Sequence, residues 1–186
     1  NVALLLGPLL AELGVSFFTA HMFVFYFAVA SAITPPVAVA AFAAASITRT
    51  EPMRTGVAAV RVGIVMFTIP FVFAWYPELL LIDEARVIAD ETGRRTFIEG
   101  YSAGIDVPSL SWLLARLVLV LYLVASSFAR YDQTALRSWE IALRLLAAIL
   151  ILWKGAAIMW IGLLLALLLI GLHVVRSRSK SALSTT

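Results

Sequence analysis

Long apolar blocks alternate with short polar segments along the whole chain. The blocks are roughly 15–28 residues long, which is the length that an α-helix needs to cross the hydrocarbon core of a bilayer. Spans are predicted over residues 20–47, 57–75, 110–129, 139–153 and 155–175, after a shorter arm over 1–18, with a turn-rich loop over 48–56 between the first two spans. The pattern therefore predicts an all-α integral membrane protein with several crossings.

The last two blocks form one nearly continuous apolar stretch over 139–175. A single helix of that length would be about 55 Å long, which is too long for one crossing. We therefore expect a helical hairpin that turns at Lys154 and Gly155.

The amino-acid composition agrees with a helical membrane protein and excludes several functional classes. Hydrophobic residues make up 62% and charged residues 13% of the 186 residues, and there is no cysteine. Disulfides and thiolate metal sites are therefore excluded, and no basic face suited to nucleic acid is visible. No Ser-His-Asp set, metal-spaced cluster or glycine-rich phosphate loop is present, so we expect neither an enzyme nor a cofactor. The chain begins with Asn inside an apolar run, and we interpret it as a piece of a longer protein.

Charge distribution predicts the topology. Nine of the 14 basic residues lie in three segments, with Arg49, Arg54 and Arg61 in the first, Arg130, Arg137 and Arg144 in the second, and Arg176, Arg178 and Lys180 in the tail. Cytoplasmic segments carry the excess of Lys and Arg. The first two segments and the C-terminus are therefore expected in the cytoplasm, with the polar segment 83–109 on the outer side. Arg61 and Arg116 lie a few residues inside their spans, and we interpret both as structural residues that reach the nearer surface.

The most informative local feature is the pair Pro35-Pro36 in the middle of the span 20–47. Neither proline has an N–H, so the carbonyls of Ser31 and Ala32 lose their helical donors, and Thr34 is pushed out of the α region. Freed carbonyls cannot face lipid, so the break must be buried in protein or must line a polar cavity. Many secondary transporters build ion and substrate sites from such broken helices.

The oxygens at this break suggest a cation site. The Ser31 and Ala32 carbonyls and the Ser31 and Thr34 hydroxyls are neutral ligands that suit Na⁺, a hard and weakly bound ion. The helix that restarts near Val37 would direct its positive end toward the break, where an anionic group could bind. Thr34, Pro36 and Val37 are the substrate-binding candidates. The alternative is a proline kink that only shapes packing.

The sequence around this break resembles the large membrane subunit of TRAP transporters. The likeness is carried by HMFVFYFAVASAITPPVAVAAFAAASI over 21–47, EPMRTG over 51–56 and IPFVFAWYPELLLI over 69–82. It is most similar to the fused permeases that work with TAXI-type binding proteins. The likeness covers about 1–82, whereas 83–186 resembles the family only in general terms.

The resemblance implies a sodium-coupled importer of organic acid anions that uses an elevator mechanism in the bacterial inner membrane and is supplied by a periplasmic TAXI-type binding protein. Residues 1–18 would be an arm of a re-entrant hairpin, and 20–47 the broken helix of the second inverted repeat. The family's sodium site maps onto Ser31, Ala32, Thr34 and Pro35. Three parts follow: the end of the transport domain over 1–82, a periplasmic loop over 83–109, and an extension with about three spans over 110–186.

A second function remains open at this point. The helices could belong to a membrane scaffold that holds partner helices and transports nothing, with the break at Pro35 as a packing kink. Small residues such as Ala38, Ala41 and Ala45 would suit that role too, because they let membrane helices approach closely.

Overall fold

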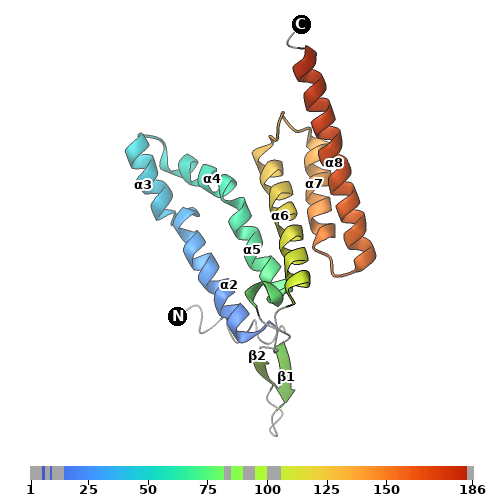
Figure 1. Ribbon diagram of the computed structural model, residues 1–186. Helices are drawn as coiled ribbons and strands as arrows, with labels where there is room; N and C mark the ends of the chain where they lie inside the picture. The colour runs from blue at the N-terminus through green and yellow to red at the C-terminus, as the bar shows by residue number, and fades with distance from the viewer. Residues whose placement is uncertain are drawn as a thin grey trace. The chain divides into compact units, whose positions relative to one another are not determined.

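Two compact units make up the chain, residues 1–114 and 115–186, and each is described by itself. The computed structural model describes residues 6, 9, 15–81, 85–89, 95–99 and 106–183, with side chains outside the two strands and the last turns of the final helix. Helices dominate both units (Figure 1). The predicted hairpin arm over 1–18 lies almost wholly outside the described residues, and the three-part division of the chain stays a prediction.

The predicted interruption of the first long span is confirmed. Helix α2 covers Phe17–Ala30, a 3-10 turn η1 covers Ser31–Ile33, and helix α3 covers Val39–Thr48. Thr34 is extended, with φ −101° and ψ 117°, as expected for a residue before proline. The helix restarts at Val39 rather than near Val37, because the backbone of Ala38 has a positive φ of 29°.

The loop predicted over 48–56 is wrong in its second half. The chain turns at Arg49, which is left-handed, and helix α4, Pro52–Val62, already begins at Pro52. Glu51 caps this helix, since its carboxylate accepts from the backbone N–H groups of Met53 at 2.9 Å and Arg54 at 2.6 Å. Proline is well suited to the first helical position, so the residues that indicated a loop instead start a helix.

The span predicted over 57–75 is bent. Helix α5, Ile64–Trp75, follows α4 after Gly63, and the two axes differ by 46°. The span ends at Trp75, as predicted, and Pro77 begins the 3-10 turn η2, Pro77–Leu80.

Aromatic contacts join α2 to α5. Phe23 and Phe27 pack against Phe71 with ring centroids 5.4 and 5.9 Å apart, both edge to face. Phe27 also approaches Phe67, at 6.2 Å. Helix α3 packs on α4, and the small residues Ala41 and Ala45 of α3 are buried. Small side chains let these two helices approach closely.

The polar segment after η2 contains a short β-hairpin that was not predicted. Strand β1, Ala85–Ala89, pairs antiparallel with β2, Arg95–Glu99 (Figure 1). This two-stranded sheet is an addition within the predicted extramembrane loop, and the prediction of a helical membrane protein is otherwise confirmed.

The second unit is built from the remaining helices. Helix α6 covers Val107–Ala129 and enters the unit at Ala115, α7 covers Ser138–Ile151, and α8 covers Ala156–Leu183. The predicted hairpin is confirmed, because α7 and α8 lie side by side and are joined by a turn over 152–155. The tail expected from Arg176 onward instead continues the last helix to Leu183.

Gly162 sets the distance between α7 and α8. A Cβ atom at this position would lie 2.7 Å from the backbone nitrogen of Ile151 and 2.8 Å from Cβ of Leu150. The backbones of the two helices therefore come together where only glycine fits, as at close crossings of membrane helices.

Length and hydropathy identify α6 and the segment Ala156–Ser177 of α8 as candidate membrane spans among the described residues, and the bent pair α4–α5 as a third if it forms one span. The two arms of the broken helix, Phe17–Ile33 and Val39–Thr48, are shorter apolar helices. These findings define a multi-pass membrane protein.

Candidate functional site

The predicted cation site lies where α2 ends. Ser31 begins the 3-10 turn, Thr34 follows it, and Pro35 and Pro36 are joined by a cis peptide bond. Thr34 and Pro35 are half-buried, whereas Ser31, Pro36 and Val37 are exposed. The chain therefore presents the break with one side against the protein and one side open.

Both hydroxyls at the break donate to carbonyls at the end of α2. Ser31 Oγ donates to the Ala28 carbonyl at 2.6 Å, and Thr34 Oγ1 donates to the Ala30 carbonyl at 2.8 Å. A hydroxyl carries one proton and two lone pairs, so both oxygens keep lone pairs that a cation can use. The two hydroxyl oxygens can therefore act as cation ligands while their protons stay hydrogen-bonded.

The two freed carbonyls behave differently. The Ser31 carbonyl accepts from the Thr34 backbone N–H at 3.1 Å, which replaces the donor that Pro35 lacks. Residue 36 would normally donate its N–H to the Ala32 carbonyl, but Pro36 has no N–H. Ala32 is therefore the stronger of the two predicted carbonyl ligands.

The second arm begins without a side-chain cap. Ala38 occupies the N-cap of α3 and makes no capping hydrogen bond, although its carbonyl accepts from Phe42 N at 2.9 Å. Helix N-termini present free N–H groups and a positive dipole end. This end follows directly after Pro36 and Val37, the residues that the sequence predicts for an anionic substrate.

Helix α4 lies directly against the break. A Cβ atom on Gly56 would be 2.8 Å from Cγ of Pro35, and one on Gly63 would be 2.8 Å from Cδ1 of Ile33. Gly56 and Gly63 are seven residues apart in the sequence, which is almost two full helical turns. Close backbone approach therefore holds the break, and the sequence analysis did not identify these glycines.

Two further polar residues of the apolar segments, His21 and Arg116, have local roles. His21 Nδ1 lies 2.9 Å from the Phe17 carbonyl of its own helix. Arg116 is buried, with 8% exposure, and its Nη2 donates to the Ile151 carbonyl at the end of α7. Its position at that carbonyl complements the negative end of the helix. Across the described residues, no group of three or more His, Cys, Asp or Glu could hold a metal ion.

A buried polar network in the second unit was missed by the sequence analysis. Arg144 is 1% exposed, and it donates to Ser126 Oγ at 2.7 Å and to Asp132 Oδ2 at 2.9 Å. Tyr122 also donates to Asp132 Oδ2, at 2.6 Å. Arg144 had counted only as one charge of a cytoplasmic segment, because its partners become neighbours only when α6 and α7 pack.

Burial by itself would raise the pKa of the Asp132 carboxyl. The hydrogen bonds from Tyr122 and Arg144, and the positive charges of Arg144 and His173, outweigh that effect and hold the pKa below its ordinary value. Asp132 is therefore ionised at neutral pH and fastens the loop after α6 to α7.

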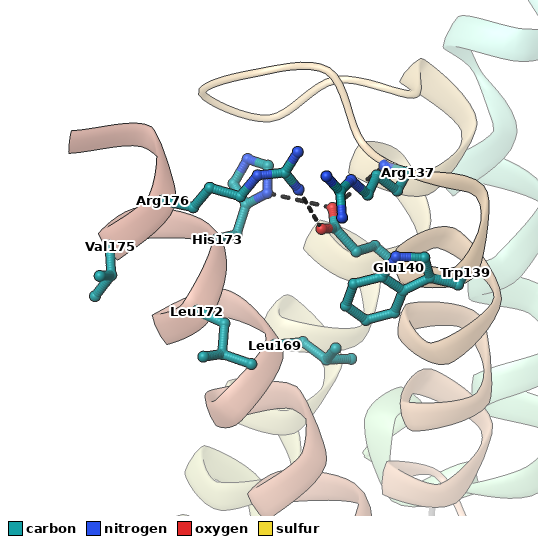
Figure 2. A pocket seen from close by; sticks show the side chains of 8 residues that line it. All are labelled: Arg137, Trp139, Glu140, Leu169, Leu172, His173, Val175 and Arg176. Atoms are coloured by element: carbon teal, nitrogen blue, oxygen red, sulfur yellow. Dashed lines mark hydrogen bonds and ion pairs between the residues drawn. The ribbon is translucent and has the colours of Figure 1, made fainter. Parts of the chain in front are cut away.

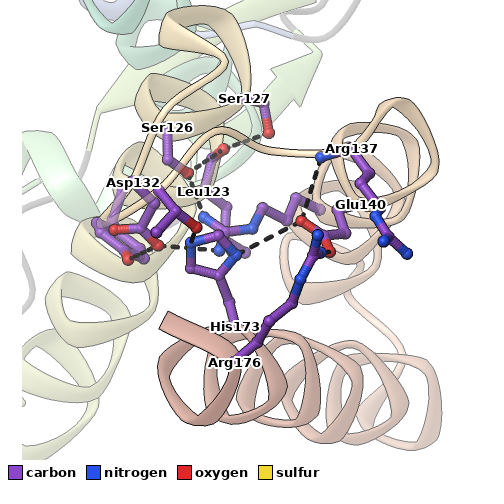
Figure 3. Close-up of polar contacts among 11 residues, drawn as sticks. Leu123, Ser126, Ser127, Asp132, Arg137, Glu140, His173 and Arg176 are labelled. Carbon is purple, nitrogen blue, oxygen red and sulfur yellow. Dashed lines mark hydrogen bonds and ion pairs between the residues drawn. The ribbon is translucent and has the colours of Figure 1, made fainter. Parts of the chain in front are cut away.

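Glu140 is the centre of a second cluster. It is 7% exposed, and its carboxylate accepts from Arg176 Nη1 at 2.9 Å and from the Arg137 backbone N–H at 3.3 Å, with His173 Nδ1 3.5 Å away. The other ring nitrogen of His173 lies 3.3 Å from Thr134 Oγ1. Figure 3 shows Asp132, His173 and Glu140 meeting at the same end of the unit. His173 is itself buried, with 3% exposure.

A pocket of about 510 Å³ opens beside this cluster (Figure 2). It lies between the start of α7 and the segment 169–176 of α8, and its walls combine charged and apolar side chains. The lining residues are Arg137, Trp139, Glu140, Leu169, Leu172, His173, Val175 and Arg176.

Taken together, the fold defines a multi-pass helical membrane protein with a proline-broken helix, which is the construction that transporters use for ion and substrate sites. The family model described as "Tripartite ATP-independent periplasmic transporter, DctM component" matches residues 2–86. This match supports the large membrane component of TRAP transporters for that part of the chain, and it is to a transporter family rather than an enzyme family. No significant match to a curated protein or to a solved structure was found.

Proposed function

We propose that this chain is part of a sodium-coupled permease that imports organic acid anions, with the break at 31–38 as part of its transport site. The observation that carries the proposal is the geometry of Ser31 and Thr34, whose hydroxyl protons are both engaged by helix carbonyls. Their lone pairs, together with the Ala32 carbonyl, suit a weakly bound Na⁺. The match over residues 2–86 supports the same class.

In this proposal the two sides of the break have separate roles. Ser31, Ala32, Thr34 and Pro35 form the sodium side, with Pro35 shaping the backbone rather than offering a ligand of its own. Thr34, Pro36 and Val37 form the substrate side, where the uncapped start of α3 attracts a carboxylate. Thr34 belongs to both sides and would couple the two ligands.

The proposal extends to mechanism and partners. A periplasmic binding protein of the TAXI type would deliver the substrate, and the unit containing the broken helix would move as an elevator in the bacterial inner membrane. The C-terminus would lie in the cytoplasm, as the distribution of Arg and Lys predicts.

The experiment measures sodium-dependent uptake by the full-length permease and its binding protein in proteoliposomes. Thr34→Ala removes one proposed ligand, and we expect the sodium concentration for half-maximal uptake to rise about tenfold, the effect of about one weak ligand. Thr34→Ser keeps the hydroxyl and should lie near wild type.

Thr68→Ala is the matched control. Thr68 is also half-buried in an apolar helix, and its hydroxyl donates to the Ile64 carbonyl at 3.4 Å, four residues earlier, as Thr34 does to Ala30. The control should keep wild-type sodium dependence. If Thr34→Ala also kept it, while altering only the assembly of the protein with its partners, the break would be a packing kink in a membrane scaffold.

A further inference from the structure

The pocket between α7 and α8 is lined by more positively than negatively charged side chains. Arg137 and Arg176 both line it, and Glu140 is the single carboxylate among its lining residues. Glu140 is already engaged by Arg176 and by the Arg137 backbone N–H. The Arg137 guanidinium is exposed and forms no ion pair within the described part of the chain. An anion can therefore bind to Arg137, next to the Arg176–Glu140 ion pair, without displacing a protein carboxylate.

Both helices also contribute apolar side chains that are open to the surroundings. Trp139 lies beside Arg137 on α7, whereas Leu172 and Val175 lie on α8, and their exposed fractions are 48%, 57% and 69% (Figure 2). A small soluble anion would leave this apolar surface in water. A ligand with a charged head and a hydrocarbon chain would cover it, which gains free energy in proportion to the area removed from water.

The position of the pocket along the candidate membrane span supports the same kind of ligand. The candidate span of α8 ends at Ser177, so the residues from Leu172 to Arg176 occupy its last turns. Trp139 lies in the first turn of α7 at the same end, where His173 and Arg176 meet Glu140. Tryptophan beside arginine is the usual composition at the level of lipid headgroups.

We propose that this pocket binds the headgroup of an acidic phospholipid. Arg137 and Arg176 hold the phosphate, and one acyl chain runs along Leu172 and Val175. His173 lies behind the phosphate position, and Glu140 keeps Arg176 in place. Because cytoplasmic segments carry the excess of Lys and Arg, we expect this end of the α7–α8 hairpin at the cytoplasmic leaflet, which is rich in acidic lipid.

The test uses the full-length protein in nanodiscs that contain equal amounts of phosphatidylglycerol and phosphatidylcholine. Spin-labelled forms of each lipid report their relative association with the protein. We expect wild type to prefer phosphatidylglycerol, and Arg137→Gln to lower that preference about fivefold, the effect of one arginine near the membrane surface. Arg137→Lys keeps the charge and should restore most of the preference. Because the Arg137 side chain has no ion-pair partner among the described residues, both variants should fold.

Arg130→Gln is the matched control, since Arg130 is an exposed arginine in the same connection and does not line the pocket. It removes the same charge and should leave the preference unchanged. Equal losses in Arg130→Gln and Arg137→Gln would overturn the proposal, because only the general charge of the surface would then matter. Displacement of the labelled lipid by excess inorganic phosphate would also overturn it, since the pocket would then be a site for soluble anions.

Discussion

Gly56 of α4 lies against Pro35, the first proline of the broken helix, so closely that a Cβ atom on Gly56 would be 2.8 Å from the proline Cγ. The proline ring is rigid and cannot move aside as a long side chain can. This contact ties the bent α4–α5 pair to the proposed transport site.

Gly56→Ala is therefore expected to destabilise the protein by about 1–3 kcal/mol, the usual cost of an extra carbon in a packed site. Thermal unfolding of the purified protein measures this effect. Gly171→Ala is the control, because a Cβ atom there meets nothing within 4 Å. It should be neutral or stabilising by up to about 1 kcal/mol, since alanine favours the helix. Equal melting temperatures for both variants would contradict the contact.

A second glycine prediction concerns the hairpin of α7 and α8. Gly162→Ala brings a carbon within 3 Å of backbone atoms of Leu150 and Ile151, which cannot rotate away. We expect a loss of at least about 1–3 kcal/mol in the free energy of unfolding. Cross-linking between cysteines introduced into α7 and α8 should weaken in the same variant. Unchanged cross-linking together with unchanged stability would show that the helices are farther apart.

Arg144→Leu tests the buried network of the second unit. The change leaves the Asp132 carboxylate with Tyr122 but without its arginine, and Asp132 is only 12% exposed. Removing one partner of a buried pair costs about 3–5 kcal/mol, and we expect a loss near the lower end because Asp132 keeps some contact with water. Arg130→Leu removes an exposed arginine and should change stability by less than about 0.5 kcal/mol. Similar effects of the two changes would contradict the assignment.

The lowered pKa of Asp132 predicts an acid-dependent loss of stability. A carboxyl whose folded pKa lies below its unfolded value of about 3.9 stabilises the fold fully above that pH. Its contribution disappears as the pH falls from about 4 through the lower folded pKa. Unfolding measured between neutral pH and pH 3 should therefore show a steeper decline for wild type than for Asp132→Asn. Parallel curves for the two proteins would show that Asp132 is not held in its charged form.

Several elements could be predicted because their causes are local. A proline removes an N–H wherever it stands, so Pro35 and Pro36 end α2 regardless of their neighbours. The predicted ends of the spans, at Trp75 and Ala129, agree with the structure for a similar reason. The length of an apolar run and the residues that end it are both properties of the local sequence. The loop over 48–56 was mispredicted because its polar residues suit a helix start as well as a loop.

The polar partners could not be predicted in the same way. Ser126, Asp132 and Arg144 come from α6, the following connection and α7, and each alone is typical of a membrane surface. The same holds for Glu140 and His173, which meet across the α7–α8 hairpin.

The sequence by itself determined the membrane class, the positions of most spans and the break at Pro35-Pro36, because apolar length and the missing proline N–H act locally. Only the tertiary structure decided that Gly56 packs on Pro35, that Arg144 is buried against Asp132, and that Arg137 and Arg176 share one pocket. These relationships depend on the distance and rotation between helices. They arise when side chains far apart in the chain are packed together, and no periodicity along one helix records them.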